Sequence, residues 1–182
     1  MLYLFLADGF EETEALAPLD CIRRAGIGIL TVGIGGEYIT GSHGIEVKAD
    51  ITAEDIDLTE CDGVFLPGGM PGTENLYASQ IVKDVVSFCA ENCKLLASIC
   101  AAPSIPGRMG LLAGKRAVCF PNFEGTLEGY IPSEKSVETD GCFITAKGAG
   151  CVFPFAHAII TYLADRETAD RILQTMQYAE LE

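Results

Sequence analysis

Residues 94–104 read Lys-Leu-Leu-Ala-Ser-Ile-Cys-Ala-Ala-Pro-Ser, and this stretch decides how the rest of the chain is interpreted. The apolar run that begins at Leu95 predicts a strand buried on both faces, as in a parallel sheet. It stops at Cys100, and residues 104–112 can form a helix. A residue in such a turn stands at the carboxyl edge of the sheet, with backbone N–H groups directed at its side chain. Because a helix end also lowers the pKa of a thiol, Cys100 is the candidate nucleophile.

Apolar segments and helical segments alternate along the rest of the chain. Strands are predicted at residues 2–7, 27–33, 63–66 and 116–120, and hairpins at 37–48 and 136–145. Helices are predicted from the acidic turn at 8–14 to Ala25, and at 75–92, 154–164 and 168–177, while 122–132 is a loop or a short helix. The order predicts a single domain over residues 1–182, a three-layer α/β/α sandwich with a mainly parallel sheet and added hairpins.

The chain is acidic, with 26 Asp and Glu residues against 12 Lys and Arg residues and a formal net charge of −14. Such a surface repels phosphate groups, so neither nucleic acid nor an anionic membrane is expected as a partner. The apolar run near the start is too short for a signal peptide or a membrane-spanning helix. Most of the eight cysteines lie in apolar runs, as reduced core residues do, and a cytoplasmic protein is predicted.

Neither a metal nor a cofactor is expected. The cysteines form no Cys-x-x-Cys pair, and His43 and His157 are the two histidines, so the sequence lacks a zinc-type cluster. Residues 148–153 resemble a Gly-x-Gly-x-x-Gly motif, but Phe153 replaces the third glycine. That segment is interpreted as a plain strand-to-helix turn.

Three loops meet at the carboxyl edge of the predicted sheet, where ligands bind in this architecture. They are residues 8–14, 67–72 and 100–103. Gly68 and Gly69 allow the main chain to approach closely. The backbone N–H groups of Gly69 and Ala101 could hold a developing oxyanion. The alternative for Cys100 is that it is one more small buried apolar side chain.

A carboxyl group is the better candidate partner for Cys100, because neither histidine is an obvious base for it. Glu11, Glu12 and Glu14 lie at the end of the first strand. All three suit the start of a helix, and for Glu11 and Glu12 this explanation is sufficient. A carboxyl buried beside a thiolate has a raised pKa and keeps its proton, which it can donate to the sulfur and move during turnover.

Several motifs in chain order resemble the ThiJ/PfpI (DJ-one) superfamily, in particular the subgroup similar to the Parkinson-disease-linked protein and its bacterial relatives. They are residues 7–14 (ADGFEETE), 18–20 and 23–26, 66–69 (LPGG), 97–103 (ASICAAP) and 145–150 (TAKGAG). The resemblance implies a flavodoxin-like sandwich, usually a homodimer. It implies that Cys100 is the elbow nucleophile, that Glu14 is its protonated partner, and that Gly69 and Ala101 occupy the oxyanion positions, with Gly68, Phe120 and Pro121 around the pocket.

Two departures limit what the resemblance implies. The protease-like branch has a histidine directly after the elbow cysteine, and here Ala101 occupies that place, so peptidase or glutamine amidotransferase activity is not expected. Some members have a histidine before Pro121, where this chain has Phe120, so a histidine-assisted mechanism is not expected. Three hypotheses remain. The first two are glyoxalase or deglycase chemistry on small 2-oxoaldehydes, and oxidative-stress sensing through Cys100 without turnover. A third is a fold relic with no turnover.

Overall fold

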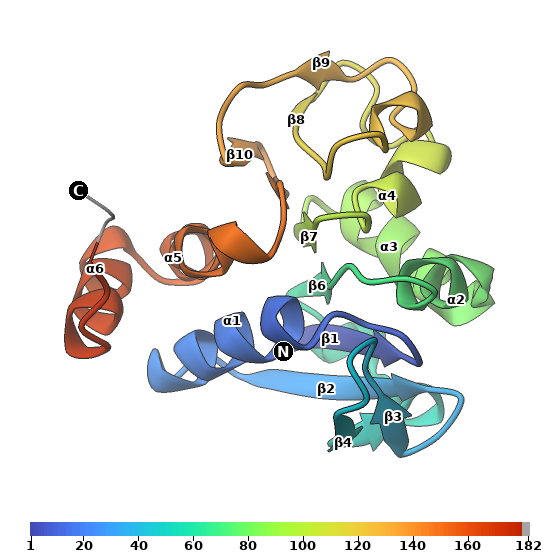
Figure 1. The fold of residues 1–182 in the computed structure, drawn as a ribbon, viewed down its shortest axis with the longest axis horizontal. Coiled ribbons are helices and arrows are strands. Elements are labelled where there is room, and N and C mark those ends of the chain that lie inside the picture. The colour runs from blue at the N-terminus through green and yellow to red at the C-terminus, as the bar shows by residue number, and fades with distance from the viewer. Residues whose placement is uncertain (180–182) are drawn as a thin grey trace.

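The computed structural model describes residues 1–179, which are organised around a seven-stranded sheet (Figure 1). The strand order is β10-β11-β7-β6-β1-β2-β5. Neighbouring strands are parallel except β10 and β11, which form an antiparallel hairpin. The bounds are β1 (Leu2–Ala7), β2 (Ile29–Ile34), β5 (Ile51–Thr52), β6 (Gly63–Leu66), β7 (Leu95–Ile99), β10 (Val137–Asp140) and β11 (Phe143–Ala146).

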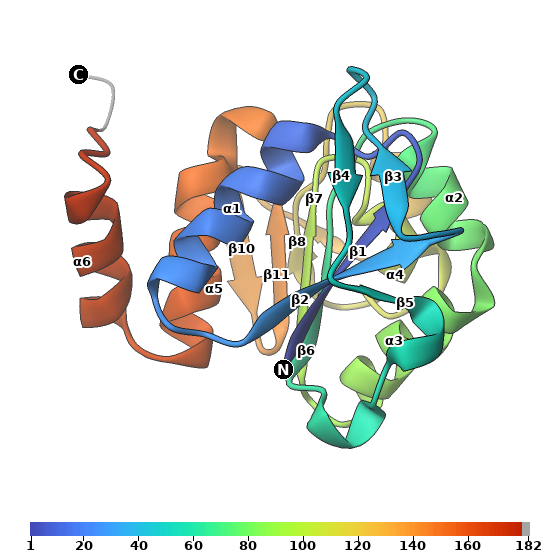
Figure 2. The ribbon, with the colours of Figure 1, turned by 90° about the horizontal axis from the view of Figure 1, so that it is seen from below.

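Helices cover both faces of this sheet, as Figure 2 shows. One face carries α1 (Glu12–Arg24), α5 (Val152–Leu163) and α6 (Arg166–Thr175). The other carries α2 (Gly72–Ala78), α3 (Gln80–Glu91) and α4 (Ser104–Arg108). The predicted three-layer sandwich is therefore confirmed, and the order β2-β1-β6-β7-β11 is the 2-1-3-4-5 order of flavodoxin-like folds. None of the helices in residues 1–179 combines the length and the hydropathy needed to cross a bilayer.

The two faces of β1 build two separate cores. Leu4 and Leu6 point into the core that includes Phe155 of α5, while Phe5 points into the core that includes Val85 of α3. All five side chains are fully buried, and each contributes about 1.5–3 kcal/mol to stability through its loss of contact with water. This two-sided burial explains why β1 is apolar throughout.

Helix α1 begins where the sequence predicts. The carboxylate of Glu11 caps it, accepting from the N–H of Glu14 at 2.6 Å, and Arg23 and Arg24 occupy its last turn. Pro18 lies inside the helix. Because proline has no N–H, the carbonyl of Glu14 lacks its usual bond from the residue four positions later.

The helix predicted at residues 75–92 is two helices. α2 ends at Ala78, Ser79 is extended with φ −74° and ψ 123°, and α3 starts at Gln80. Six residues along one helix turn by about 600°, so an unbroken helix would point Leu76 and Val82 in directions about 120° apart. The extended residue lets both side chains reach the same core, and both are fully buried.

The additions to the sheet also differ from expectation. The hairpin β3 (Tyr38–Thr40) and β4 (Glu46–Lys48) forms a separate two-stranded sheet, and the unpredicted β5 is the edge strand beside β2. The strand predicted at 116–120 is limited to β8 (Arg116–Ala117), which pairs with β9 (Ile131–Pro132). It ends early because the next N–H groups bond elsewhere: Val118 donates to Thr145 Oγ1 at 3.0 Å. The helix predicted at 104–112 is limited to α4.

Candidate active site

Cys100 follows β7 directly and occupies a left-handed backbone conformation with φ +64°. Such a conformation is uncommon for a residue with a side chain, and here the surrounding chain enforces it. The N–H of Cys100 donates to the carbonyl of Ala146 at 2.9 Å, and its own carbonyl accepts from the N–H of Phe120 at 2.8 Å. These two bonds hold the backbone of Cys100 in the turn, and its side chain is half-buried.

The expectation that a helix end lowers the thiol pKa is wrong in direction. Burial first, and then the neighbouring Glu14 carboxylate, raise the pKa of Cys100 to about 12. Hydrogen bonds from the backbone N–H groups of Ala101 and Gly69 act in the opposite direction, but they do not outweigh it. The adjacent α4 is one short turn that begins only at Ser104, which explains why a helix end has little influence at the sulfur.

The carboxyl of Glu14 is the ionisable neighbour of that sulfur. Glu14 comes from the first turn of α1, is 1% exposed, and its Oε2 accepts from the N–H of Gly68 at 3.0 Å. Burial raises the pKa of Glu14 to about 7; hydrogen bonds with Cys100, Gly68 and Ala149 lower it, and the nearby Glu11 charge raises it. Glu14 is therefore the glutamate of the three that meets the thiol.

The thiol and the carboxyl titrate as a pair. Their pKa values of about 7 for Glu14 and about 12 for Cys100 mean that the pair holds two protons in acid and one proton at moderately alkaline pH. In that singly protonated state, the sulfur and the carboxylate share one negative charge. Cys100 is nucleophilic in the arrangement in which the remaining proton lies on Glu14.

Two glycines make this contact possible. A Cβ at Gly68 would lie 2.6 Å from both the Cβ of Cys100 and Oε2 of Glu14. Gly69 has φ +90°, and a Cβ there would lie 2.4 Å from the backbone nitrogen of Glu11. The loop after β6 therefore passes between α1 and Cys100 only because it lacks side chains at these positions.

Phe120 lies beside the pair, because its backbone N–H donates to the Cys100 carbonyl. A Cβ at Gly148 would touch the Phe120 ring at 3.4 Å and would lie 3.9 Å from Oε1 of Glu14. The Phe120 side chain is 46% exposed. Pro121 instead lines a cavity of about 280 Å³ together with Cys119 and Lys147.

The turn at residues 148–149 also contributes to the site, although its sequence pattern predicts a plain strand-to-helix turn. Gly148 packs against Phe120, and the backbone of Ala149 bonds to Glu14. The TAKGAG motif at 145–150, which resembles the family, is the sequence signal that places them here.

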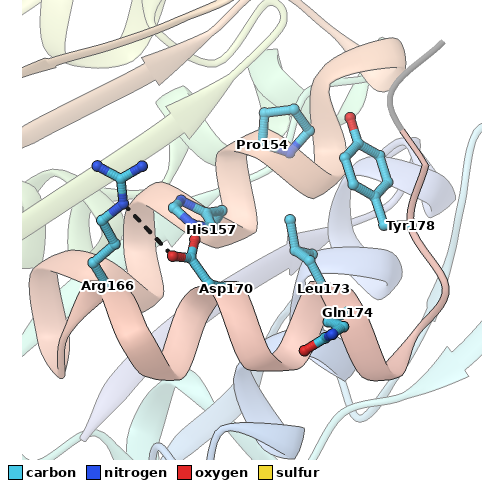
Figure 3. Close-up of a pocket in the computed structure, with 7 residues that line it drawn as sticks. All are labelled: Pro154, His157, Arg166, Asp170, Leu173, Gln174 and Tyr178. Atoms are coloured by element: carbon cyan, nitrogen blue, oxygen red, sulfur yellow. Dashed lines mark hydrogen bonds and ion pairs between the residues drawn. The ribbon is translucent and has the colours of Figure 1, made fainter. Parts of the chain in front are cut away.

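Each histidine has a carboxylate partner of its own. Nδ1 of His43 lies 2.7 Å from Oε2 of Glu12. Nε2 of His157 lies 2.7 Å from Oδ1 of Asp170, inside a cavity of about 490 Å³ between α5 and α6 (Figure 3). This larger cavity is lined by neither Cys100 nor Glu14, so its size does not make it the site of thiol chemistry.

Within residues 1–179, one cluster has three potential metal ligands close together: Glu11, Glu12 and His43. The oxygens of Glu12 already accept from the backbone N–H of His43 at 2.7 Å and from its ring. These contacts fasten the β3–β4 turn to α1, which is a sufficient structural role for Glu12.

Comparison with known proteins identifies the family to which this arrangement belongs. A family model described as the DJ-1/PfpI family matches residues 1–162. The chain belongs to the DJ-1/PfpI family.

Two relatives and one solved structure in this family match the chain over nearly their whole length. The Parkinson disease protein 7 homolog of Danio rerio is 34% identical, over 93% of this chain and 92% of the relative. A protein named deglycase from Pyrococcus abyssi is 26% identical, over 86% of this chain and 95% of the relative. A structure described as Toxoplasma gondii DJ-1, oxidized, is 30% identical, with a TM-score of 0.93 over 98% of both chains. The DJ-1/PfpI relationship thus covers both the strands and the loops that hold Cys100 and Glu14.

Proposed function

We propose that this DJ-1/PfpI protein is a cofactor-independent enzyme that converts small 2-oxoaldehydes, such as methylglyoxal, to hydroxy acids through Cys100. The observation that carries the proposal is the contact of a half-buried thiol with a carboxyl whose pKa is raised to about 7. A pair that exchanges one proton near neutral pH can supply both a nucleophile and an acid–base group. The relative named deglycase supports carbonyl chemistry in the family.

The first step is addition of the thiolate to the aldehyde carbon. With the pair's proton on Glu14, the Cys100 sulfur forms a bond to C1 and the carbonyl electrons move to oxygen. The N–H groups of Gly69 and Ala101, which point at the sulfur, are suited to stabilise that oxyanion. Glu14 then gives its proton to the oxygen, which leaves a hemithioacetal and a Glu14 carboxylate.

The second step moves a proton between the two carbons. The Glu14 carboxylate takes the proton from C1, the electrons pass to C2 and its oxygen, and the proton returns at C2. The proton of the C1 hydroxyl passes to the C2 oxygen as the C1 carbonyl forms. C1 is oxidised to a thioester while C2 is reduced to an alcohol, so no external oxidant is needed. Water then displaces Cys100 and releases the hydroxy acid, which restores the thiol–carboxyl pair.

The experiment is a measurement of lactate formed from purified methylglyoxal. The wild-type protein should form lactate, and Cys100→Ser and Glu14→Gln should lose that activity. Cys119→Ser is a matched control, because Cys119 is a buried thiol that lines a different cavity. Lactate formation that persists in Cys100→Ser, or that is absent from the wild type, overturns the proposal.

A second candidate function is oxidative-stress sensing by Cys100 without turnover. The backbone N–H groups of Ala101 and Gly69 directed at the sulfur favour it, because they could equally bind the oxygens of a sulfinate. The structure described as an oxidised DJ-1 supports it by analogy. Mass spectrometry after mild peroxide tests it: two oxygens added to Cys100 are expected, and an unmodified Cys100 excludes it.

We also propose that the protein is a cytoplasmic homodimer. The eight free thiols are suited to a reducing compartment, which supports a cytoplasmic location. The resemblance to the family supports a homodimer, and light scattering during gel filtration tests it. A mass equal to a single chain of 19.4 kDa excludes the dimer.

A further inference from the structure

A pair of thiols, Cys61 and Cys89, lies at the edge of the sheet opposite to Cys100. Cys61 stands just before β6, and Cys89 lies in the last turn of α3, shortly before β7. Both residues are fully buried, and their sulfur atoms are 3.8 Å apart. The proposed chemistry at Cys100 does not use either of them.

The surroundings shift the pKa values of the two thiols in opposite directions. The contact with Cys89 lowers the pKa of Cys61 against the effect of burial, and the backbone of Gly63, Lys94 and the N-terminal ammonium also lower it. The same contact, together with burial, raises the pKa of Cys89. Either sulfur can donate in the 3.8 Å contact, and the Cys61 thiol also lies 3.6 Å from the Gly63 carbonyl oxygen. The pKa directions favour loss of the first proton from Cys61, and the thiolate is the form that reacts with oxidants.

We propose that Cys61 and Cys89 form a reversible disulfide when the protein reacts with hydrogen peroxide, independently of Cys100. The Cys61 thiolate attacks one peroxide oxygen, the O–O bond breaks, and the departing hydroxide takes up a proton to form water. The Cys89 sulfur then attacks the resulting sulfenic acid, and its hydroxyl leaves with the Cys89 proton as a second water. Two thiols lose two electrons and one peroxide gains them.

Both thiols are fully buried, and neither lines the cavity at this edge of the sheet. A cavity of about 450 Å³ opens at the same edge of the sheet, and Asp62 and Lys94 line it. Asp62 is the residue after Cys61, and the backbone N–H of Lys94 bonds to the Cys89 carbonyl at 2.8 Å. Hydrogen peroxide is close to water in size, so we expect it to reach the pair through local opening of this edge of the sheet.

The crosslink would enclose the loop that carries Gly69. Cys61 and Cys89 are 28 positions apart, and the chain between them holds β6, the 67–72 loop, α2 and most of α3. The sulfurs must approach from 3.8 Å to about 2.05 Å to form the disulfide. Because a disulfide restricts the unfolded chain, the oxidised protein should unfold several degrees higher than the reduced one.

The test uses the full chain carrying Cys100→Ser, so that oxidation at Cys100 does not consume the peroxide. After peroxide treatment and alkylation of the remaining thiols in denaturant, Glu-specific digestion separates the cysteines. Cleavage after Glu60, Glu74 and Glu91 places Cys61 in peptide 61–74 and Cys89 in peptide 75–91, while Cys93 falls in the next peptide. The expected result is a linked pair of peptides 61–74 and 75–91, two hydrogens lighter than their sum, which dithiothreitol separates.

Controls keep the result interpretable. Cys21, a buried cysteine whose side chain contacts the Met176 sulfur, should stay alkylatable throughout. Cys89→Ser should leave Cys61 as a sulfenic acid that dimedone traps. The proposal is overturned if Cys61 and Cys89 are both recovered as free thiols, if Cys61 is linked instead to Cys93, or if the link forms only after circular dichroism shows loss of the fold.

Discussion

The backbone N–H of Gly68 donates to Oε2 of Glu14 at 3.0 Å, and this bond joins the loop after β6 to the first turn of α1. It fixes the carboxyl where it meets Cys100, so the geometry of the site depends on two elements that are far apart in the chain. The absence of a side chain at residue 68 is as important as the carboxyl itself, because a Cβ would lie 2.6 Å from both partners.

Gly68→Ala tests this dependence. The added methyl group must displace Cys100 or Glu14, so lactate formation should fall about 10²-fold, the loss expected when catalytic groups move by about 1 Å. Unfolding free energy should fall by about 1–3 kcal/mol from overpacking. Gly125→Ala is the matched control, since a Cβ there meets no atom within 4 Å. Equal activity in the two variants would show that residue 68 does not position the pair.

The pH dependence of stability should reveal the burial of Glu14. Its pKa is about 7 in the folded protein and 4.5 ordinarily, so its contribution to stability is complete below pH 4.5 and is lost as pH rises through 7. The variant Glu14→Gln has no ionisable group at this position, so its stability should not show this loss as pH rises. Urea unfolding from pH 4.5 to 8 should therefore show the wild type losing about 3 kcal/mol relative to the variant. A constant difference over this range would contradict the raised pKa.

Glu12 should show the opposite pH dependence. Burial raises the pKa of Glu12, but hydrogen bonds from His43 and from backbone N–H groups lower it to about 2. Its contribution is complete above pH 4.5 and is lost as pH falls through 2. At pH 7, Glu12→Gln should destabilise the protein by about 1–3 kcal/mol, because strong bonds to a charged acceptor are lost. This loss should shrink in acid. Glu128→Gln, at an exposed glutamate, should change stability little at either pH.

Much of the site could be predicted from local sequence. The apolar run ending at Cys100, the acidic start of α1 and the paired glycines each indicate a strand end, a helix start or a close approach of backbone. The sheet edge then brings them together, so the sequence indicates Gly68 and a glutamate at the start of α1, and the family resemblance singles out Glu14. The fold class followed from the same alternation of strands and helices.

What could not be predicted depends on tertiary neighbours. The break at Ser79 arises because Leu76 and Val82 must reach one core, and the sequence between them carries no glycine or proline. The direction of the Cys100 pKa follows from burial beside Glu14, which outweighs the local turn. The contact of Cys61 with Cys89 likewise joins two segments whose sequences give no sign of pairing.

The most direct test of the account is the rate at which iodoacetamide alkylates Cys100 as pH is raised from 5 to 10. Tryptic peptide 95–108 contains Cys100 as its single cysteine, so the rate can be followed for this thiol alone. The account predicts a midpoint near pH 7, where the Cys100–Glu14 pair loses its first proton. In Glu14→Gln the midpoint should move above about 8.5, the ordinary value for a thiol, because glutamine cannot take the proton and burial still disfavours the thiolate. A wild-type rate that stays flat through pH 7 and rises only at the alkaline end would place the charge on Glu14 alone and contradict the proposed chemistry.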